Sequence, residues 1–459
     1  MALLTDLPRP SSSRLAVRLT PDARRQVRSG HPWVYEGSIR SVNREGAAGD
    51  LAVVFDDERQ FIAIGLWDPA SPIRIKVLHT GRPVTIDDNW FVGKFESARK
   101  LRQSLIDTAG TPTQTTGYRV VHGENDGLPG LVVDRYGDVL VLKLYTAAWI
   151  PHLADIVPAL VAVLGQCSIV LRLARSMRDQ PLFGLEEGLV LAGDPVTGTV
   201  GFDETGLHFE ADVVRGQKTG HFLDQRDNRV RVGALAAGRR VLDLFSCTGG
   251  FSVHAAAGGA KTVLSVDSSP GALETARRNM ALNVSLPNVR ACEHQTVAAE
   301  AFGELERLGE ARRRFDLVIV DPPSFAQNAA SVARAITSYE RLTTLAIALL
   351  EPEGILVQAS CSSRVSDAEF FRAVHTAASR AGTDLEEIER TGHALDHPIT
   401  FPEGGYLKTM YARPTTPIGR RVPRTLAAAL PDEPAPAEAG RSRGRDAAAA
   451  RPKRTRPTG

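Results

Sequence analysis

Three segments of this 459-residue sequence carry residues whose types and spacing suit ligand binding. The first is an apolar run, Val241–Phe245, that continues into Gly249 and Gly250. Glycines let a backbone turn sharply and approach a ligand closely, and the first N–H groups of a following helix suit a carboxylate. About twenty residues later a second apolar run ends in Asp267, which can accept hydrogen bonds from both hydroxyls of a ribose. A third apolar run is followed by DPPSF, and its aspartate, Asp321, would add a polar group to the pocket formed by the first two segments. We therefore prefer a nucleoside-type ligand to the alternative in which Asp243 and the glycines only cap a strand.

A dinucleotide would suit the spacing, but GxGxxG is absent, which disfavours it. The four cysteines lie far apart, at Cys167, Cys247, Cys292 and Cys361. They form neither a disulfide framework nor a CxxC metal pattern, so a special cysteine would be a reactive thiol. Cys361 follows the apolar run 354–360. From the residues alone, a nucleophile and a buried small apolar residue are equally good interpretations of it.

The elements that must position these residues begin at about residue 203. Apolar runs at 241–245, 262–267, 315–321 and 354–360 alternate with helical patterns at 270–282 and 333–350. Alternation of buried strands with helices predicts an α/β fold with a doubly wound, Rossmann-like parallel sheet. Ligands of such sheets bind beyond the carboxyl ends of the strands, where the glycines, Asp267 and DPPSF would lie.

Upstream, short strand patterns with turn signals predict a small β unit with one helix at 21–29. Helical spacing follows at 90–107, and mixed patterns at 118–195 include two strands joined at 136–138. The predicted strands of the β unit are 15–19, 51–55, 61–66 and 73–77. We therefore predict four parts: a small β domain at 1–85, a central α+β domain at 86–200, the doubly wound domain at 201–413, and a disordered tail at 414–459.

Charge and composition place further limits. The net charge is only +2, but Arg413–Gly459 holds eleven Arg and Lys against four Asp and Glu. That excess suits phosphate contacts. No apolar run approaches the roughly 18 residues of a membrane span, and the N-terminus lacks the pattern of a secretory signal. We expect a cytoplasmic protein that does not bind a membrane.

With these motifs in view, the sequence resembles class I S-adenosylmethionine-dependent methyltransferases. More closely, it resembles the large-subunit (23S) ribosomal RNA cytosine-C5 methyltransferases that carry an N-terminal PUA domain. The likeness extends over about residues 14–412. The segments that carry it are HPWVYEGSI, GENDGLPGLVVDRYGD, GHFLDQRDNR, VLDLFSCTGGFS, SVDSS, DPPSF, SCSS and DHPITFPEGGYLK.

The resemblance implies S-adenosyl-L-methionine as cofactor, and it implies roles for individual residues. Asp267 would hold the ribose, and Gln295 would lie near the adenine, where the family usually has an acidic residue. Gln225 would close over the cofactor, and Arg226 would contact the target base. The methionine part would be lined by Phe245, Ser246, Gly249 and Gly250.

For catalysis, the resemblance places the nucleophile at Cys361. Cytosine C5 is a poor nucleophile, and a thiolate added to C6 makes it electron-rich enough to take a methyl group. Asp321 would bond N3 and the amino group of the target cytosine, and Phe325 would stack on the base. The sequence does not identify the base that removes the C5 proton.

The implied partner is ribosomal RNA, and a homodimer is possible. Basic residues beside aromatics in the first unit suit phosphates and exposed bases: Arg24, Arg25, Arg28 and His31 beside Trp33 and Tyr35. The alternative is a solvated helix end followed by a core tryptophan. Two other functions stay open: a guanine or adenine N-methyltransferase that uses DPPSF and needs no cysteine, and a non-catalytic RNA-binding assembly factor.

Overall fold

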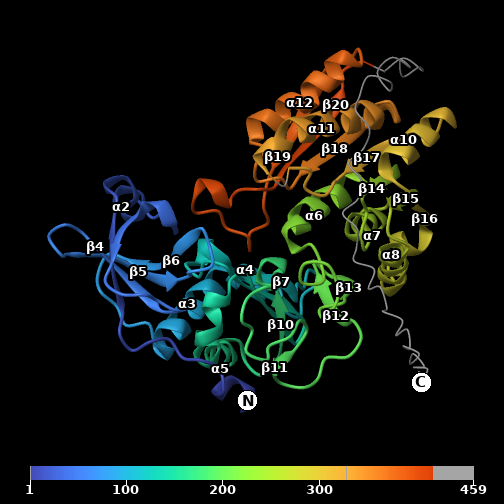
Figure 1. Cartoon of the computed structure of the whole chain (residues 1–459). Coiled ribbons are helices and arrows are strands. Elements are labelled where there is room, and N and C mark those ends of the chain that lie inside the picture. Colours follow the sequence, from blue (N-terminus) through green and yellow to red (C-terminus); the bar gives the residue numbers. More distant parts are fainter. Residues whose placement is uncertain (1, 327, 417–459) are drawn as a thin grey trace, which may run out of the picture. The chain divides into compact units, whose positions relative to one another are not determined.

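The computed structural model describes residues 2–326 and 328–416 (Figure 1). The predicted basic tail lies outside the described residues from 417 onward. Within the described ranges the strands form four sheets, of six, five, two and seven strands. The predicted domain boundaries near 85, 200 and 413 remain predictions.

The N-terminal sheet has the strand order β2-β6-β5-β4-β1-β3. Buried and exposed residues alternate along β1, as in a strand with one buried face. Helix α2 begins where Thr20 caps the amide of Ala23 and Pro21 occupies the first turn. The short strands β2 and β3 were not predicted from the sequence. The elements are α1 (Ala2–Thr5), β1 (Leu15–Leu19), α2 (Pro21–Arg28), β2 (Trp33–Tyr35), η1 (Glu36–Ser38), β3 (Ile39–Val42), β4 (Leu51–Phe55), β5 (Phe61–Trp67) and β6 (Ile73–Thr80).

The central sheet has the order β11-β10-β9-β8-β7. Tyr136 at the end of β8 pairs with Val139 at the start of β9, which confirms the predicted tight turn at this point. Its elements are α3 (Asp88–Leu101), α4 (Gln103–Ile106), β7 (Gly117–His122), η2 (Gly123–Asp126), β8 (Leu131–Tyr136), β9 (Val139–Leu144), η3 (Ala147–His152), α5 (Leu153–Leu164), β10 (Ser168–Leu173), η4 (Arg175–Met177) and β11 (Val190–Ala192).

One hydrophobic core joins the N-terminal sheet to the central part. Leu66 and Leu78 of the N-terminal sheet belong to the same buried cluster as Phe91, Phe95 and Leu142 of the central part. A sheet face that packs against α3 and β9 in this way is removed from water together with them, so the two parts stabilise each other.

The helical stretch Ala147–Leu164 corrects one expectation from the sequence. Among the described residues it alone is long and apolar enough to cross a membrane, with a mean hydropathy of 1.7. Of this stretch, 61% is buried inside the protein. Core helices of non-membrane proteins meet the same criteria, so the stretch is weak support for a membrane span.

The last sheet holds seven strands in the order β16-β15-β14-β17-β18-β20-β19. The first five are parallel, which confirms the predicted α/β class, whereas β20 pairs antiparallel with β18 and with β19. That antiparallel edge was not predicted. The chain runs outward from β14 to β16 and returns to β17 on the other side of β14. The strand order therefore reverses between β14 and β17, the position where such sheets bind ligands.

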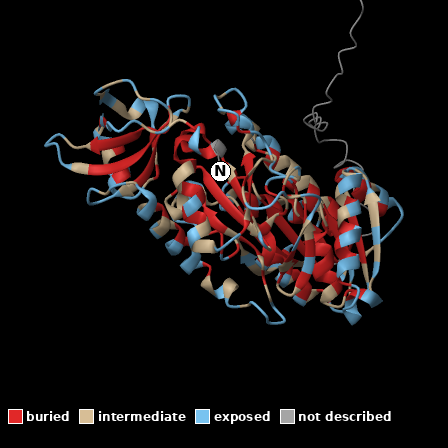
Figure 2. Ribbon diagram, turned by 90° about the horizontal axis from the view of Figure 1, so that it is seen from below, coloured by how far each residue is buried: buried red, intermediate tan, exposed pale blue. Residues whose placement is uncertain are grey.

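Helices cover both faces of this sheet (Figure 1). Its inner strands β14, β15, β17 and β18 are mainly buried, and Figure 2 colours buried residues red. Leu242 and Val318 face a core that includes α10, α11 and α12, whereas Val241 and Leu317 face α6 and α7. The elements are β12 (Val200–Glu204), β13 (Leu207–Ala211), η5 (Leu223–Gln225), α6 (Arg226–Leu235), β14 (Arg240–Leu244), α7 (Gly250–Ala257), β15 (Thr262–Asp267), α8 (Pro270–Leu282), α9 (Pro287–Ala291), β16 (Glu293–Ala298), α10 (Ala301–Glu310), β17 (Phe315–Val320), η6 (Ala329–Ser331), α11 (Val332–Ile347), β18 (Leu350–Ser360), α12 (Asp367–Arg380), β19 (Leu385–Thr391), η7 (Pro402–Gly404) and β20 (Lys408–Pro414).

Candidate cofactor and nucleophile site

The glycine-rich turn after β14 has a tightly constrained backbone. Phe245, Cys247 and Gly249 all have positive φ, at 60°, 47° and 79°. The amide of Ser246 donates to the carbonyl of Val266 (3.1 Å), which ties the turn to β15. A Cβ atom at Gly249 would lie 2.8 Å from the Cβ of Ala276, so only glycine fits there. The predicted residues Phe245, Ser246, Gly249 and Gly250 therefore form one turn at the switch point of the sheet.

Buried polar atoms at this turn lack partners among the described residues. Asp243 is fully buried; its Oδ2 accepts from Ser252 (2.6 Å), but its Oδ1 has no partner. The hydroxyl of Ser246 is also buried and unpaired. Such atoms cost free energy unless a ligand or water bonds to them. Their chemistry fits the charged amino-acid end of S-adenosylmethionine.

Burial raises the pKa of Asp243 to about 7, and the hydrogen bond from Ser252 only partly opposes this shift. The hydrogen bonds continue from Ser252 to Ser265 (2.6 Å) and from Ser265 to His294 (2.8 Å). This series of hydrogen bonds runs from His294 on β16 through Ser265 to Ser252 on α7, and it fixes the orientation of the Asp243 carboxyl group.

Asp267 ends β15 next to the same turn. Its Oδ2 accepts from the amide of Cys247 (2.9 Å) and its Oδ1 from the amide of Ser269 (2.8 Å). Each carboxylate oxygen has a further lone pair, so both ribose hydroxyls could still donate to it. The role predicted for Asp267 therefore fits its position.

The structure does not bring Gln295 to this site. Gln295 lies opposite Leu264 in the middle of β16, whereas Ala298 lies opposite Asp267. The side chain is exposed and donates to Glu293 (2.6 Å). The strand extends three residues beyond Gln295, so the position beyond its carboxyl end belongs to Ala299 and not to Gln295. The adenine contact assigned to Gln295 is corrected accordingly.

Asp321 and Cys361 follow neighbouring strands, β17 and β18. The Cys361 sulfur lies 3.7 Å from the carbonyl oxygen of Pro322. Burial raises the pKa of Asp321 to about 7, and the negative charge of Asp224 adds to this shift. Burial also raises the pKa of Cys361 to about 12, with a further contribution from Asp321, whereas Lys218 lowers it. The thiol is therefore protonated in the free protein at neutral pH.

The loops around Asp321 and Cys361 are bonded to each other. The hydroxyls of Ser324 and Ser362 are 2.9 Å apart, and Tyr339 OH bonds to Ser360 (2.8 Å). The half-buried ring of Phe325 lies 5.2 Å from the ring of Tyr339. Hydrogen bonds and a ring contact thus join the DPPSF and SCSS loops to each other and to Tyr339.

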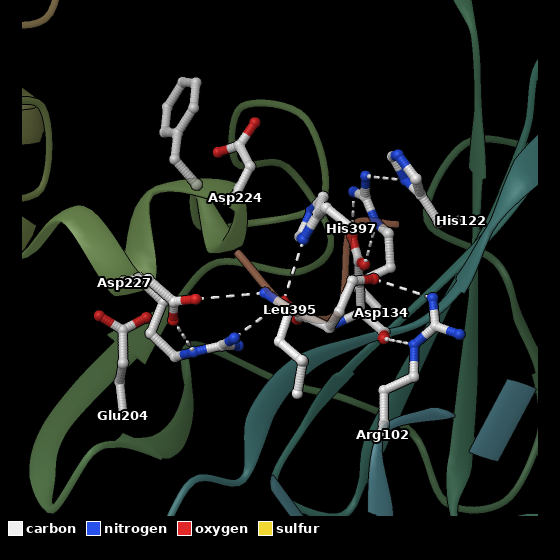
Figure 3. Close-up of polar contacts among 12 residues, drawn as sticks. Arg102, His122, Asp134, Glu204, Asp224, Asp227, Leu395 and His397 are labelled. Carbon is white, nitrogen blue, oxygen red and sulfur yellow. Dashed lines mark hydrogen bonds and ion pairs between the residues drawn. The ribbon is translucent and has the colours of Figure 1, made fainter. Parts of the chain in front are cut away.

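Gln225 directly precedes α6 and Arg226 is its first residue, but the two side chains contact different groups. Gln225 is buried, donates to the carboxylate of Asp321 and accepts from Asn228 (2.6 Å). Arg226 is 1% exposed and pairs with Asp396 (3.0 Å) and Asp227 (3.1 Å). Asp227 also accepts from the amide of Leu395 (Figure 3). Gln225 therefore lies at the site, whereas Arg226 holds the segment that contains Leu395 and Asp396.

His221, His397 and Cys247 also lie within the segments that carry the family resemblance. His221 is buried, and burial together with the charge of Arg229 lowers its pKa to about 3, so its ring is neutral. Burial raises the pKa of Cys247, inside the cofactor turn, to about 11. His397 donates its backbone amide to Ala394, as expected of a turn residue.

Sequence reasoning missed two groups beside the site. Lys218 lies two residues before the segment GHFLDQR, and Asp224 lies within it and accepts from the hydroxyl of Tyr406 (2.8 Å). Their signal was their position in or next to that segment. The second group is a buried pair, Glu204 with Arg229 (2.6 Å), which places α6 against the hairpin of β12 and β13.

Most of the predicted RNA-binding residues of the N-terminal unit have protein partners. On α2, three arginines pair with carboxylates: Arg24 with Asp57 (2.7 Å), Arg28 with Asp56 (2.9 Å), and Arg25 with Asp22. Trp33 donates to Glu124 (3.0 Å), and its ring lies 5.1 Å from that of Phe401. Tyr35 is 46% exposed. RNA contact by this unit remains a prediction.

Comparisons with known proteins agree with this geometry. The family described as S-adenosylmethionine-dependent methyltransferase matches residues 158–412, and a PUA-like domain matches residues 17–80. A Deinococcus radiodurans protein named ribosomal RNA large subunit methyltransferase is 47% identical over 405 residues, which cover 88% of this chain and 98% of that protein. A Tolumonas auensis protein named ribosomal RNA large subunit methyltransferase I is 36% identical over 400 residues, which cover 86% and 98%.

Two solved structures share the fold. A methyltransferase complexed with SAH has a TM-score of 0.73 at 21% identity, with 87% of this chain and 99% of that chain covered. A protein from Streptococcus mutans described as SAM-dependent has a TM-score of 0.70 at 20% identity, with 86% and 99% covered. The chain therefore belongs to the family of S-adenosylmethionine-dependent methyltransferases that combine this catalytic domain with an N-terminal PUA-like domain.

Proposed function

We propose that this methyltransferase acts on large-subunit ribosomal RNA and that it methylates C5 of a cytosine in 23S rRNA. Two relatives over 35% identical, each matched along 98% of its length, are named for large-subunit ribosomal RNA. The motifs SCSS and DPPSF support the cytosine-C5 assignment through their family resemblance. We propose the cytoplasm as the location of the enzyme.

The observation that carries the proposal is that a thiol and a carboxyl group follow neighbouring strands next to the switch point of the sheet. Cys361 and Asp321 follow adjacent strands, next to the turn of Ser246 and Gly249. Covalent catalysis at C5 requires a nucleophile for C6 together with a group that bonds the ring where charge develops. An N-methyltransferase requires only the second group.

S-adenosylmethionine supplies the methyl group in this reaction. Cys361 gives up its thiol proton to a base, and its thiolate adds to C6, which moves the ring electrons to C5. The new bond from C5 to the methyl carbon would form as the methyl–sulfur bond of the sulfonium breaks, and S-adenosylhomocysteine would leave with that electron pair. The C5 proton then leaves to a base, and the electron pair of that bond expels the thiolate from C6. Because burial raises the pKa of Asp321 to about 7, the protonated form of this carboxyl group is accessible at neutral pH. In that form it can donate to N3 of the cytosine as the thiolate adds.

Trapping with a fluorinated base tests the proposal. Large-subunit rRNA that contains 5-fluorocytosine would hold the adduct, since fluorine at C5 cannot leave as a proton does. Mass spectrometry should find the RNA attached to Cys361, and Cys361→Ala should lose both the adduct and methyl transfer while it keeps cofactor binding. The matched control is Cys247→Ala. It removes the second thiol of the site and should keep both the adduct and methyl transfer.

Three outcomes would overturn the proposal. If Cys361→Ala still methylated C5, or if the adduct formed on Cys247, the assigned nucleophile would be wrong. If the methyl group appeared on a base nitrogen, the N-methyltransferase alternative would replace the cytosine-C5 proposal, with Asp321 and Phe325 as its site.

A further inference from the structure

Tyr145 is an aromatic residue that is held on a fixed backbone and left open to solvent. It directly follows β9, and its amide donates to the carbonyl oxygen of Gly130 (2.9 Å). Its own carbonyl oxygen accepts from the hydroxyl of Ser176 (3.4 Å). The residue is 49% exposed, and its phenol hydroxyl has no hydrogen-bond partner among the described residues. The backbone thus holds the ring in place, while the ring itself stays accessible.

Two ammonium groups lie beside this ring. Nζ of Lys143 lies 5.5 Å from the ring centroid of Tyr145 and donates to the backbone carbonyl oxygen of Lys218 (3.1 Å). The Lys218 side chain is 45% exposed, and its ammonium lies 3.5 Å from the carboxylate of Asp224 and 4.1 Å from the ring centroid of Phe222. An ammonium has three donors, so both lysines can bond further acceptors.

The loop between β13 and η5 adds another cation to this surface. The buried Arg172 of β10 fixes the loop, because it donates to the carbonyl oxygens of Val213 (3.0 Å) and Gly216 (2.8 Å). Arg215 on this loop is exposed and forms no ion pair within residues 2–326 and 328–416. The carboxylate of Asp212 accepts instead from two backbone amides of the loop (2.8 and 3.1 Å). A phosphate can therefore pair with Arg215 as well as with the two ammonium groups.

This surface borders the cofactor turn. Three residues after Lys218, Nδ1 of His221 lies 3.3 Å from the hydroxyl of Thr248 in that turn. Gln225, at the end of the same segment, donates to the carboxylate of Asp321. An enzyme that acts on a base inside folded RNA takes that base out of the stack. The neighbouring nucleotides of the same strand then need contacts outside the site.

We propose that Tyr145 is a stacking platform for an unpaired base of the substrate RNA beside the target nucleotide, and that Lys143, Arg215 and Lys218 contact the phosphates of that strand. Stacking on an aromatic ring tolerates any sequence, because every base has a π face. The proposal rests on the proposed function for RNA as the substrate, but not for the atom of the base that receives the methyl group.

The first test is fluorescence anisotropy of the full-length protein with a labelled single-stranded oligocytidylate of about 12 nucleotides, without cofactor. Tyr145→Ala should weaken binding about five- to 100-fold through the lost stacking, whereas Tyr145→Phe keeps the ring and should stay within about twofold of the wild type. Leu282→Ala is the matched control, because this residue on α8 is 45% exposed and should leave the affinity unchanged.

The salt dependence of binding separates the ring from the charges. For single strands, each lost phosphate contact reduces the slope of log K against log salt concentration by about 0.7. Lys218→Met should reduce the slope by about that amount, whereas Tyr145→Ala should leave it unchanged. An unchanged slope in Lys218→Met would refute its phosphate contact. Equal affinities of Tyr145→Ala and the wild type, or an equal loss in Leu282→Ala, would overturn the platform.

Photochemical crosslinking gives a direct readout. A probe that carries 5-iodocytidine crosslinks to aromatic side chains on which the base stacks, and mass spectrometry should find the crosslink at Tyr145. Crosslinks at Tyr35 alone, which is 46% exposed, would place the stacking on the N-terminal unit and overturn the proposal. A product methylated on a base nitrogen would refute the proposed cytosine-C5 function while leaving these results intact.

Discussion

The sulfur of Cys361 lies 3.7 Å from the carbonyl oxygen of Pro322, the residue directly after Asp321. The candidate nucleophile therefore contacts the backbone of the loop that carries the candidate acid. Because β17 and β18 are parallel neighbours, both groups lie beyond the same edge of the sheet. A shift of either loop would change the distance between the thiol and the carboxyl group.

Asp267→Ala should weaken the binding of S-adenosylmethionine. It removes the acceptor for the ribose hydroxyls and for the amides of Cys247 and Ser269. Hydrogen bonds to a charged group contribute about 1.5–3 kcal/mol each, so calorimetry should show at least a tenfold loss of affinity. Gln295→Ala is the control and should bind normally. A loss in Gln295→Ala with none in Asp267→Ala would reverse our placement of the two residues.

Asp243→Asn should change how stability depends on pH. Burial raises the pKa of Asp243 in the folded protein to about 7, above the ordinary value of an aspartate. The folded protein thus binds the proton more tightly than the unfolded chain, and Asp243 reduces stability as the pH rises from about 4 to 7. Asparagine does not titrate, so the stability of the variant relative to the wild type should increase across that range and level off above pH 7.

Urea unfolding of both proteins at pH 5 and pH 8, without ligand, measures this difference. A relative stability that is equal at the two pH values would show that Asp243 does not titrate between them. Ser269→Ala, which removes a helix cap and no titrating group, is the control for a pH-independent change.

The sequence predicted those elements whose ends carry strong local signals. The bounds of β15 and α8 agree with the predicted ranges, because Asp267 ends an apolar run and Ser269 and Pro270 cap and start a helix. The polar strand β19 (LEEIERT) was missed because it has no apolar run. The antiparallel strand beside it, β20, takes its direction from tertiary pairing, which periodicity does not reveal.

For the site, too, the sequence predicted what local signals determine and missed what depends on tertiary structure. Residues within one motif, such as Ser246 and Gly249, meet because they form one turn. Gln295 was misplaced because the end of β16 depends on its register against β15. Asp224 and Tyr406 are 182 positions apart, and only the fold brings them together beside Lys218.

Glu204→Ala should destabilise the protein strongly. Glu204 and Arg229 are 0% and 3% exposed and bond at 2.6 Å, so the variant would leave a buried arginine unpaired. Breaking a buried pair costs about 3–5 kcal/mol. Glu274→Ala is the matched control, because its pair with Arg277 is exposed and worth about 0–1 kcal/mol. Equal losses of unfolding free energy in the two variants would contradict the distinction.

The Glu204 contribution should also depend on pH. Burial would raise the pKa of Glu204, but the charge of Arg229 and bonds from His254 and Arg229 hold it well below its usual value. A lowered folded pKa gives stability that is present above the unfolded pKa and is lost as the pH falls. The difference between wild type and Glu204→Ala should therefore shrink as the pH falls below about 4.5.

Leu66→Ala should loosen the central sheet as well as the N-terminal one. Leu66, on β5, is fully buried in the core that also contains Leu131 and Val133 of β8. Deleting a buried leucine side chain costs about 2–5 kcal/mol. Because the two sheets share that core, the cost should appear in the opening of both.

Hydrogen exchange should show faster exchange of the β8 amides together with the β5 amides. Leu345→Ala, in the separate core between α11 and the last sheet, should leave β5 and β8 unchanged. Protection of β8 that persists in Leu66→Ala while β5 exchanges faster would mean that the two parts open independently despite their common core.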